Sequence, residues 1–363
     1  MSKVAFIADV HLGVPNRLDD IVFSLNTIKE YCRLCEIDTV VVLGDLFHDR
    51  RSITIDTLVA ATKFFKECQK LGQEWIAFPG NHDMFLRHSW DINSLQPLDK
   101  HLTIINEIKL LKLDDQRFWV LPFIQYEKAY MRVLKKLEEH VQEGDKLLTH
   151  VGVRGATLNN CFLLKDWSTV NFENTKFDKI YTGHFHSKQQ LGNVWYPGSP
   201  IPFKFDEGDV PHGFYVYDTK TDSHKFINIW KIAGKIFPDA TPPPQFYSIP
   251  DTEIDTIDES KAKHNMIRIM LSRDYTREEK RIIKERIINL GAKAVRWLNL
   301  SKKTETESKK LPSYVESHDL FDSWINADTK GIKDLDLKVL VATHTDIINE
   351  GDELYSIEED ESL

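Results

Sequence analysis

The stretch from Thr39 to Arg50, TVVVLGDLFHDR, sets an apolar run of mostly β-branched residues directly before a polar turn. Short apolar runs of this kind are typical of strands buried on both faces, and glycine followed by aspartate is typical of a turn. The run from Val4 to Ala8 has the same arrangement, because Asp9-Val10-His11 follows it at once. We therefore predict two buried strands that each deliver polar side chains to the loop at their carboxyl end.

Three further strand-like runs carry polar motifs in the same position. They are Glu74 to Phe78 before Gly80-Asn81-His82-Asp83, Lys146 to Thr149 before His150, and Lys179 to Tyr181 before Gly183-His184-Phe185-His186. The carboxyl ends of neighbouring parallel strands meet at one edge of a sheet, where α/β proteins build their sites. We expect the five motifs to converge at such an edge.

Helical periodicity separates these strands. The segment Asp19 to Cys35 places Ile21, Leu25 and Ile28 on one apolar stripe. Further helices are predicted for Ile55 to Leu71 and Glu127 to Gln142, and further strands for Phe118 to Leu121 and Gly213 to Tyr217. Strands that alternate with helices over residues 1–237 predict a layered α/β domain.

The composition changes after residue 237. Residues 238–262 contain a Pro-Pro-Pro run followed by acidic residues, which predicts a linker. Residues 263–300 predict a small α+β capping domain of strand-helix-strand order. Its strands are Met266 to Leu271 and Ala294 to Leu300, and its helix, Arg277 to Leu290, begins at a Thr276–Glu279 capping box and stops before Gly291.

The last segments are strongly polar. Residues 301–312 consist almost entirely of Ser, Thr, Lys and Glu and predict a charged linker. Residues 313–363 predict a helical segment with an acidic tail, with helices over Asp319 to Ile325 and Ile332 to Asn349. A helical pair outside a finished domain usually packs on something else, so we expect a partner protein to bind here.

The bulk composition narrows the class of protein. Of the 363 residues 41% are hydrophobic, which suits a sizeable core, and no apolar run has the length of a membrane span. The net charge of −9 does not favour a nucleic-acid partner, but acid is concentrated in Asp251 to Glu259 and Glu350 to Glu361. The amino terminus has no secretory pattern, so we expect a cytoplasmic protein. Cys32 and Cys35 form a single CxxC pair, which we interpret as small apolar residues on a helix.

The five motifs supply only oxygen and imidazole donors. A set without cysteine argues against a closed structural zinc site, and mixed donors suit manganese, iron or zinc. Two metal ions about 3.5–4 Å apart clamp a phosphate ester for in-line attack by an activated water molecule. A single motif of this kind is compatible with an ordinary turn. Five of them, each after an apolar strand, indicate a metal site, because histidine has no packing reason to recur at strand ends.

In their content and order these motifs resemble those of the calcineurin-like metallophosphoesterases, over roughly residues 1–230. The resemblance implies a sandwich of two mixed sheets flanked by helices, with two divalent metal ions, expected to be Mn²⁺. It implies one site made by Asp9, His11, Asp45 and His186, and a second made by Asp45, Asn81, His150 and His184. In the family pattern Asp45 bridges the ions. His82 contacts the scissile phosphate and assists the leaving oxygen, and Asp83 orients and charges His82.

Three features narrow the resemblance to the SbcD branch of double-strand-break repair nucleases. In GDLFHDR, His48 follows the bridging aspartate by three residues; bacterial SbcD proteins usually have Asp there, whereas archaeal and eukaryotic relatives have His. The string Tyr196-Pro197-Gly198-Ser199-Pro200 and the appended capping domain and helical pair also resemble that branch. His48 is then a second phosphate-facing histidine. The short linkers and the length are most similar to phage-encoded members.

This resemblance implies a Mn-dependent deoxyribonuclease, with 3′–5′ exonuclease activity on duplex ends and endonuclease activity on single strands. It would process DNA ends in recombination, repair or replication, as a homodimer bound through its C-terminal helices to an SbcC-type coiled-coil ATPase, in an SbcCD-like heterotetramer. The helices predicted over Asp19 to Cys35 and Ile55 to Leu71 are the candidate dimer face. Candidate DNA contacts are basic side chains near the motifs: Arg17, Arg50, Arg51, Arg87, His88 and Arg154.

Two other functions stay open at this point. A phosphodiesterase or phosphatase for small or protein substrates fits the acidic net charge, although it has no need of a C-terminal helical pair bearing Phe321 and Trp324. A non-catalytic scaffold on the same fold would have lost ligands or the active histidine, whereas every expected position is filled here.

Overall fold

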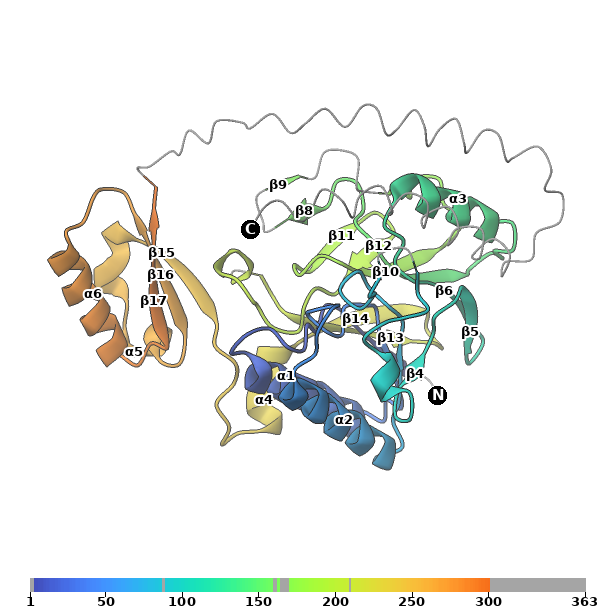
Figure 1. Ribbon diagram of the computed structural model, residues 1–363, viewed down its shortest axis with the longest axis horizontal. Coiled ribbons are helices and arrows are strands. Elements are labelled where there is room, and N and C mark those ends of the chain that lie inside the picture. Colours follow the sequence, from blue (N-terminus) through green and yellow to red (C-terminus); the bar gives the residue numbers. More distant parts are fainter. Residues whose placement is uncertain (1–2, 87–88, 159–161, 164–169, 209, 301–363) are drawn as a thin grey trace.

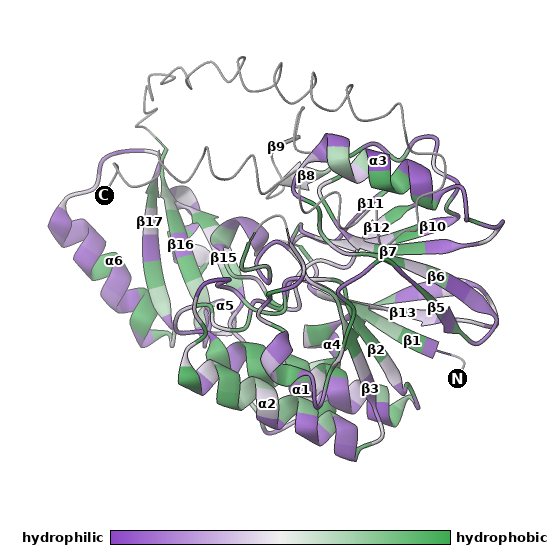
Figure 2. Ribbon diagram, turned by 45° about the vertical axis from the view of Figure 1, so that its right-hand side comes forward, coloured by the Kyte–Doolittle hydropathy of each residue, from purple (hydrophilic) through white to green (hydrophobic). Residues whose placement is uncertain are grey.

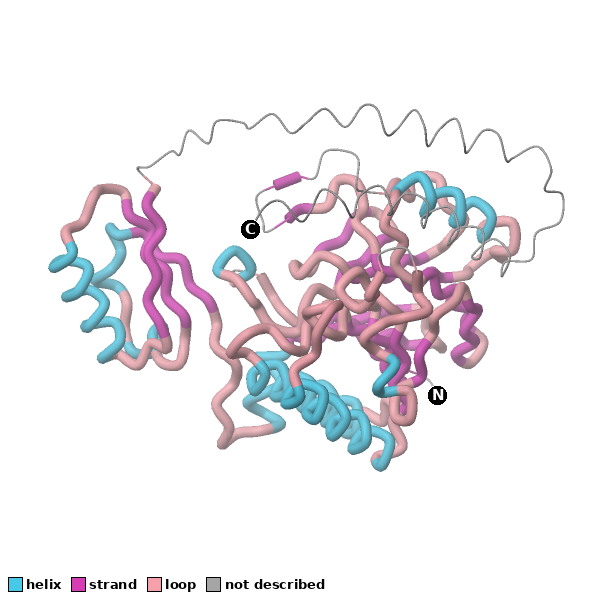
Figure 3. Tube along the Cα trace, in the orientation of Figure 1, coloured by secondary structure: helices cyan, strands magenta, loops and turns pink. Residues whose placement is uncertain are grey.

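The computed structural model describes residues 3–86, 89–158, 162–163, 170–208 and 210–300. Within them, two six-stranded sheets lie face to face, with helices on both outer sides and a small third sheet beside them (Figure 1). This arrangement confirms the expected α/β class with two mixed sheets. The loops gather in the middle of the molecule, between the strands of the large sheets and the small sheet (Figure 3).

The first large sheet has the strand order β14-β13-β1-β2-β3-β4. In that order its strands are Ser223–Asn228, Gly213–Asp218, Lys3–Ile7, Thr39–Val42, Glu74–Ala77 and Thr103–Ile104. The strands β1 to β4 are parallel, and β13 pairs antiparallel with β1. The helices α1 (Leu18–Leu34), α2 (Ile55–Lys70) and α4 (Ile229–Ile236) cover its outer face.

The second large sheet has the strand order β11-β12-β10-β7-β6-β5. In that order its strands are Gln189–Leu191, Val194–Tyr196, Lys179–Gly183, Lys146–His150, Gln116–Leu121 and Lys109–Leu113. The four central strands are parallel and the two edge strands pair antiparallel. The helix α3 (Glu127–Leu137) covers its outer face, and the short strands β8 (Thr157–Leu158) and β9 (Phe162–Leu163) form a separate ribbon.

Side-chain alternation along the strands fills three layers of core. In β1, Val4 and Phe6 pack between the two sheets, while Ala5 and Ile7 face the helices. The interlayer core is aromatic: the Phe6 ring lies 4.7 Å from that of Tyr181 and 5.7 Å from that of Phe118. The buried strands are therefore apolar along most of their length, whereas the covering helices alternate between apolar and polar residues (Figure 2).

The small third sheet is all parallel, in the order β15-β16-β17, with bounds Phe246–Pro250, Met266–Leu271 and Ala294–Asn299. The helix α6 (Arg277–Asn289) covers one face, and its predicted capping box is present, since Thr276 and Glu279 exchange hydrogen bonds. The predicted linker over residues 238–262 was wrong in part. From Phe246 onward it forms β15, a 3₁₀ turn (Asp251–Thr256) and α5 (Glu259–Ala262), because Ile249 and Ile254 are buried in this core.

The end of α3 differs from the prediction, and the segments predicted after residue 300 are not described. The helix α3 ends at Leu137 rather than at the predicted Gln142, because the N–H groups of Glu139 and His140 bond to carbonyls three residues back instead of four. The N–H of Gln142 donates to the Asp145 carboxylate (3.0 Å). The charged linker over 301–312 and the helical segment over 313–363 lie outside the described residues. In the part of the chain that is described, no helix is both long and apolar enough to cross a bilayer.

Candidate metal centre

All seven predicted metal ligands come together at the carboxyl ends of five parallel strands. Asp9 and His11 follow β1, Asp45 follows β2, Asn81 follows β3, His150 is the last residue of β7, and His184 and His186 follow β10. The strands β1 to β3 belong to one large sheet and β7 and β10 to the other. The site therefore lies where the edges of the two sheets meet.

One group of donors is formed by Asp9, His11 and His186. The Nε2 atoms of the two histidines lie 3.0 Å apart, and one donor atom of each of the three residues falls within 4.8 Å of the others. The Asp9 carboxylate also accepts the backbone N–H of His184 at 2.9 Å, which holds the loop after β10 against the loop after β1.

A second group of donors is formed by Asn81, His150 and His184. The Asn81 Oδ1 atom lies 3.1 Å from His150 Nε2 and 3.0 Å from His184 Nδ1. Asp45 connects the two groups, since its Oδ2 lies 3.3 Å from His150 Nε2 and 3.8 Å from His11 Nε2. The geometry matches a pair of sites that share one aspartate.

Two of the histidines have a fixed tautomer. His150 Nδ1 donates to the backbone carbonyl of Leu43 (2.8 Å), so Nε2 presents its lone pair to the site. His186 Nδ1 contacts the Oε1 atom of Glu207 at 2.9 Å, which leaves His186 Nε2 facing His11. A histidine that ligates a metal commonly donates its other N–H to a carboxylate or carbonyl in this way.

Glu207 is a partner of the predicted ligand His186 that the sequence did not reveal. Its side chain is 1% exposed, and its second oxygen, Oε2, accepts the backbone N–H groups of Phe203 (2.7 Å) and Lys204 (3.3 Å). It lies 21 residues after its partner His186, in the 3₁₀ turn η2 (Phe205–Glu207), with no motif around it. The one nearby signal was the Tyr196 to Pro200 string, whose Ser199 N–H donates to the His186 carbonyl at 3.0 Å.

The backbone at the ligands is strained. Asp9, His11, Asp45 and His184 have φ angles of 52°, 52°, 54° and 100°, in a region that residues with a side chain seldom adopt. Such strain persists only where the surrounding structure over-determines it, and it concentrates at functional sites. Here it lets consecutive loop residues turn their side chains inward.

The glycines of the motifs are there because the chain passes very close to the ligands. A Cβ atom on Gly44 or Gly183 would collide with the ring of His150, and one on Gly80 would collide with the carboxylate of Asp45. Any larger residue would therefore displace a ligand. Glycine in the GD, GNHD and GHFH motifs is thus required by the lack of room for a side chain, in addition to the chemistry of the residues beside it.

The electrostatics of the centre are those of two buried carboxylates, Asp9 and Asp45, placed among histidines. Burial raises the pKa of Asp9 to about 6 and, with the neighbouring His150, lowers the pKa of His184 to about 3. The pKa of His150 rises to about 9 in spite of burial, because Asp45 lies beside it. None of the described hydrogen bonds or ion pairs of Asp9 and Asp45 involves a lysine or arginine side chain. Divalent cations fit this donor set and would reverse the cost of burying its carboxylates.

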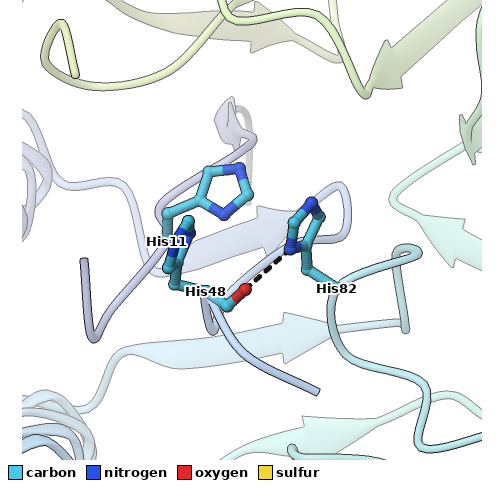
Figure 4. Close-up of side chains that lie close together, drawn as sticks. All are labelled: His11, His48 and His82. Atoms are coloured by element: carbon cyan, nitrogen blue, oxygen red, sulfur yellow. Dashed lines mark hydrogen bonds between the residues drawn. The ribbon is translucent and has the colours of Figure 1, made fainter. Parts of the chain in front are cut away.

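His48 and His82 stand beside the ligands, as predicted, but Asp83 does not orient His82. The rings of His48 and His82 are stacked, with centroids 5.7 Å apart, and His82 Nδ1 donates to the His48 backbone carbonyl at 2.6 Å (Figure 4). The buried Asp83 carboxylate instead accepts the N–H groups of Leu46, Phe47 and Gly80 and the hydroxyl of Ser94, at 3.0–3.2 Å. It ties the loops after β2 and β3 together and so positions His82 only through the backbone.

His11, His48 and His82 also come close enough to form a third group of possible donors. His11 Nε2, however, faces His186 and Asp45, which places it in the first group. Two partly buried aromatic rings complete the walls: Phe203 lies edge-on to His11 and His186, and Phe123 is stacked on His184 at 6.2 Å.

The predicted DNA-contacting arginines lie in different settings. Arg17 is committed elsewhere, because its guanidinium donates to Asp20 (2.6 Å) and to the Pro202 carbonyl (3.1 Å) with only 12% of the side chain exposed. Arg154 is half exposed and lies 3.7 Å from Glu127. The remaining candidates are Arg50, which is half-buried, Arg51, which is exposed, and Arg87 and His88, which lie outside the described residues.

A model of the calcineurin-like phosphoesterases matches residues 2–188, slightly more than half of the chain. The chain belongs to the calcineurin-like phosphoesterase family. The family uses divalent metals, in agreement with the clusters of possible metal donors that the described residues form at this site. The solved structure of the calcineurin-like phosphoesterase YfkN from Bacillus subtilis is 11% identical, covers 65% of this chain and 95% of its own, and has a TM-score of 0.38.

Several relatives of this calcineurin-like phosphoesterase are named as nucleases. Exonuclease subunit 1 of Enterobacteria phage T4 is 24% identical over 237 residues, which are 62% of this chain and 67% of the relative. The SbcD component of the nuclease SbcCD from Staphylococcus saprophyticus is 24% identical over 257 residues, 62% of this chain and 68% of its own. The DNA double-strand break repair protein Mre11 of Methanopyrus kandleri is 32% identical over 87 residues, 23% of this chain and 19% of its own.

Proposed function

We propose that this calcineurin-like phosphoesterase is a two-metal-dependent DNA nuclease, a 3′–5′ exonuclease on duplex ends and an endonuclease on single strands. The observation that carries the proposal is the convergence of seven donors from five loops, with His48 and His82 stacked beside them. The names of the T4 and SbcCD relatives support nuclease activity, and the name of the Mre11 relative supports DNA as the substrate. A non-catalytic scaffold is not favoured, since no predicted ligand is missing.

The predicted ligands would divide between two ions, with Asp45 available to both. Asp9, His11 and His186 would hold one, and Asn81, His150 and His184 the other. When bound, two divalent ions polarise the phosphate and activate a water molecule for in-line attack. Mn²⁺ is the proposed metal because the resemblance to SbcD-type nucleases implies it, although the mixed oxygen and imidazole donors also suit iron or zinc.

His82 is the proposed group that assists the leaving oxygen. A carbonyl can only accept, so the contact from His82 Nδ1 to the His48 carbonyl fixes the proton on Nδ1 and leaves Nε2 for the substrate. With Nε2 protonated as well, His82 can donate that proton to the departing oxygen. His48, whose ring is parallel to that of His82, is the proposed second contact to the phosphate.

The proposed partners are DNA and an ATPase of the SbcC type. The segment 313–363 would bind the base of the ATPase coiled coil, and a homodimer would complete a heterotetramer that processes DNA ends in the host cytoplasm. Support for this comes from the relative named as part of the nuclease SbcCD. Co-purification of the full chain with a long coiled-coil ATPase tests the partnership directly.

The activity is tested with purified protein, Mn²⁺ and two labelled DNAs, a linear duplex and a single strand. We expect nucleotides to be released from the 3′ ends of the duplex and internal cuts in the single strand. A parallel assay with a nitrophenyl phosphodiester addresses the second candidate, a phosphodiesterase for small substrates, which the net charge of −9 favours. Turnover of the diester without any cleavage of DNA, with or without the ATPase, would contradict the nuclease proposal.

A further inference from the structure

One short segment touches both the metal centre and the small domain that contains β15 to β17. It runs from Pro202 to Gly208 and includes η2. On its inner side, Glu207 holds His186 Nδ1 at 2.9 Å and is itself fixed by the backbone N–H of Phe203 at 2.7 Å. The position of the segment therefore decides where the Glu207 carboxylate lies.

The outer side of the segment is held by the small domain. The ring of Phe205 lies 5.0 Å from that of Phe246 in β15, and the guanidinium of Arg268 in β16 lies 5.1 Å above Phe205. Arg268 also donates to the Asp206 carboxylate at 2.7 Å, with 18% of its own side chain exposed. Gly208 passes so close to the Phe246 carbonyl that no side chain would fit between them.

A second set of contacts joins the same segment to the start of α1. Arg17 lies 5.2 Å from the ring of Phe246 and donates to the carbonyl of Pro202. Lys293 of the small domain reaches Asp20 at 3.6 Å. The segment thus has contacts at Pro202, Phe205, Asp206 and Gly208. These positions lie on both sides of Glu207, which contacts the predicted ligand His186.

We propose that the small domain holds His186 in its metal-binding orientation through Phe205, Asp206 and Glu207, with Arg268 as the positioning residue. These three residues form a single 3₁₀ turn, so a shift of Phe205 or Asp206 moves Glu207 with it. Anything that moves the small domain, such as bound DNA or a partner protein, then changes the affinity of the first metal group. The inference rests on the proposed two-metal site but not on DNA as its substrate.

The test measures Mn²⁺ binding by calorimetry on the full chain, so it does not depend on catalysis. The variant E207A removes the partner of His186, and we expect Mn²⁺ affinity at one of the two sites to fall about 10- to 100-fold. In R268A the Glu207 carboxylate remains but loses its support, and we expect a smaller loss at the same site. The conservative variant R268K keeps the charge near Asp206 and should recover part of that loss.

A double variant separates positioning from a general loss of stability. If Arg268 acts through Glu207, R268A adds nothing to the loss already present in E207A, whereas independent effects would multiply. The matched control is R281A, since Arg281 is a half-exposed arginine of the same domain, paired only with Glu278 and Glu285 of its own helix among the described ion pairs. We expect R281A to bind Mn²⁺ as the unaltered protein does.

Two results would overturn the inference. One is a folded R268A variant whose Mn²⁺ affinities equal those of the unaltered protein; the other is an R268A loss that multiplies with that of E207A. Circular dichroism establishes that each variant is folded. A protein that binds two Mn²⁺ ions but cleaves no DNA would instead contradict the proposed function and leave this test intact.

Discussion

The two ends of strand β7 both carry buried ionisable groups, but they differ in how charge is balanced. At the amino end, Lys146 is 2% exposed, bonds to Gln116 and pairs with Asp222 at 3.2 Å. At the carboxyl end, His150 is fully buried beside Asp45 at 3.3 Å. The first end contains a cation from the chain itself. The second has two carboxylates, Asp9 and Asp45, that pair only with histidines and backbone N–H groups among the described residues.

A second buried carboxylate at the amino end of β7 is also paired within the chain. Asp145, at 1% exposure, accepts two hydrogen bonds from Arg117 and one from the Trp119 indole at 2.8 Å. Every oxygen of this carboxylate is satisfied within the chain. Buried polar groups alone therefore do not indicate a functional site. What marks the metal centre is a buried pair of carboxylates whose described side-chain partners are histidines, a donor set that divalent cations fit.

The largest effect is expected for D45A, which removes the residue shared by both donor groups. Both ions should be lost and hydrolysis should fall to the metal-free background. Mn²⁺ at about 100 times its Kd should raise the free energy of unfolding of the unaltered protein by about 2.7 kcal/mol for each bound ion, and D45A should lose the gain from both ions. Urea unfolding with Mn²⁺ and with a chelator measures it. A D45A variant that Mn²⁺ still stabilises fully would refute the bridging role.

The next effect separates residues that hold metal from residues that act on substrate. In H82A we expect kcat to fall about 10²- to 10⁴-fold while Mn²⁺ binding is unchanged, because His82 is placed as an acid and not as a ligand. H48A serves as the comparison and should lose less. Steady-state kinetics and calorimetry on the same preparations measure both quantities. Loss of a Mn²⁺ ion in H82A would instead place His82 among the ligands.

At the amino end of β7, the variant D145A should lower the stability of the fold without changing metal binding. It leaves the buried Trp119 indole N–H without its partner and breaks the pair with Arg117, so we expect unfolding to become easier by about 2–3 kcal/mol. Mn²⁺ affinity should not change, because Asp145 directly precedes β7 whereas the predicted ligand His150 is the last residue of that strand. Chemical unfolding and calorimetry decide the matter, and a changed Mn²⁺ affinity would mean that the two ends are coupled.

The smallest effect concerns pH. Burial opposes ionisation of Asp145, but the hydrogen bonds from Arg117, the Gln142 N–H and Trp119 prevail and lower its pKa below the ordinary value. A carboxyl group with a lowered folded-state pKa stabilises the protein above pH 4 and loses that contribution as the pH falls further. In metal-free protein, the free energy of unfolding should therefore fall less steeply below pH 4 in D145N than in the unaltered protein. Equal slopes would show that Asp145 titrates normally.

The sequence by itself predicted most of the elements and the residues that gather at the candidate metal centre. Apolar runs of β-branched residues predicted β1, β2 and β3, and polar motifs directly after them predicted the edge where Asp45 lies. These features are local, because a strand and the loop that ends it are written in about ten consecutive residues. The seven predicted ligands accordingly lie together, although His11 and His186 are 175 positions apart.

Only the tertiary structure decided what supports those ligands. It placed Glu207 against His186, gave Asp83 to the backbone of neighbouring loops rather than to His82, and drew Arg17 into the junction with the small domain. It also showed that part of the proline-rich and acidic stretch 238–262 forms the strand β15. Such partners meet across different loops and domains, where the fold sets the distance, and no spacing along the chain encodes which carboxylate will meet which histidine.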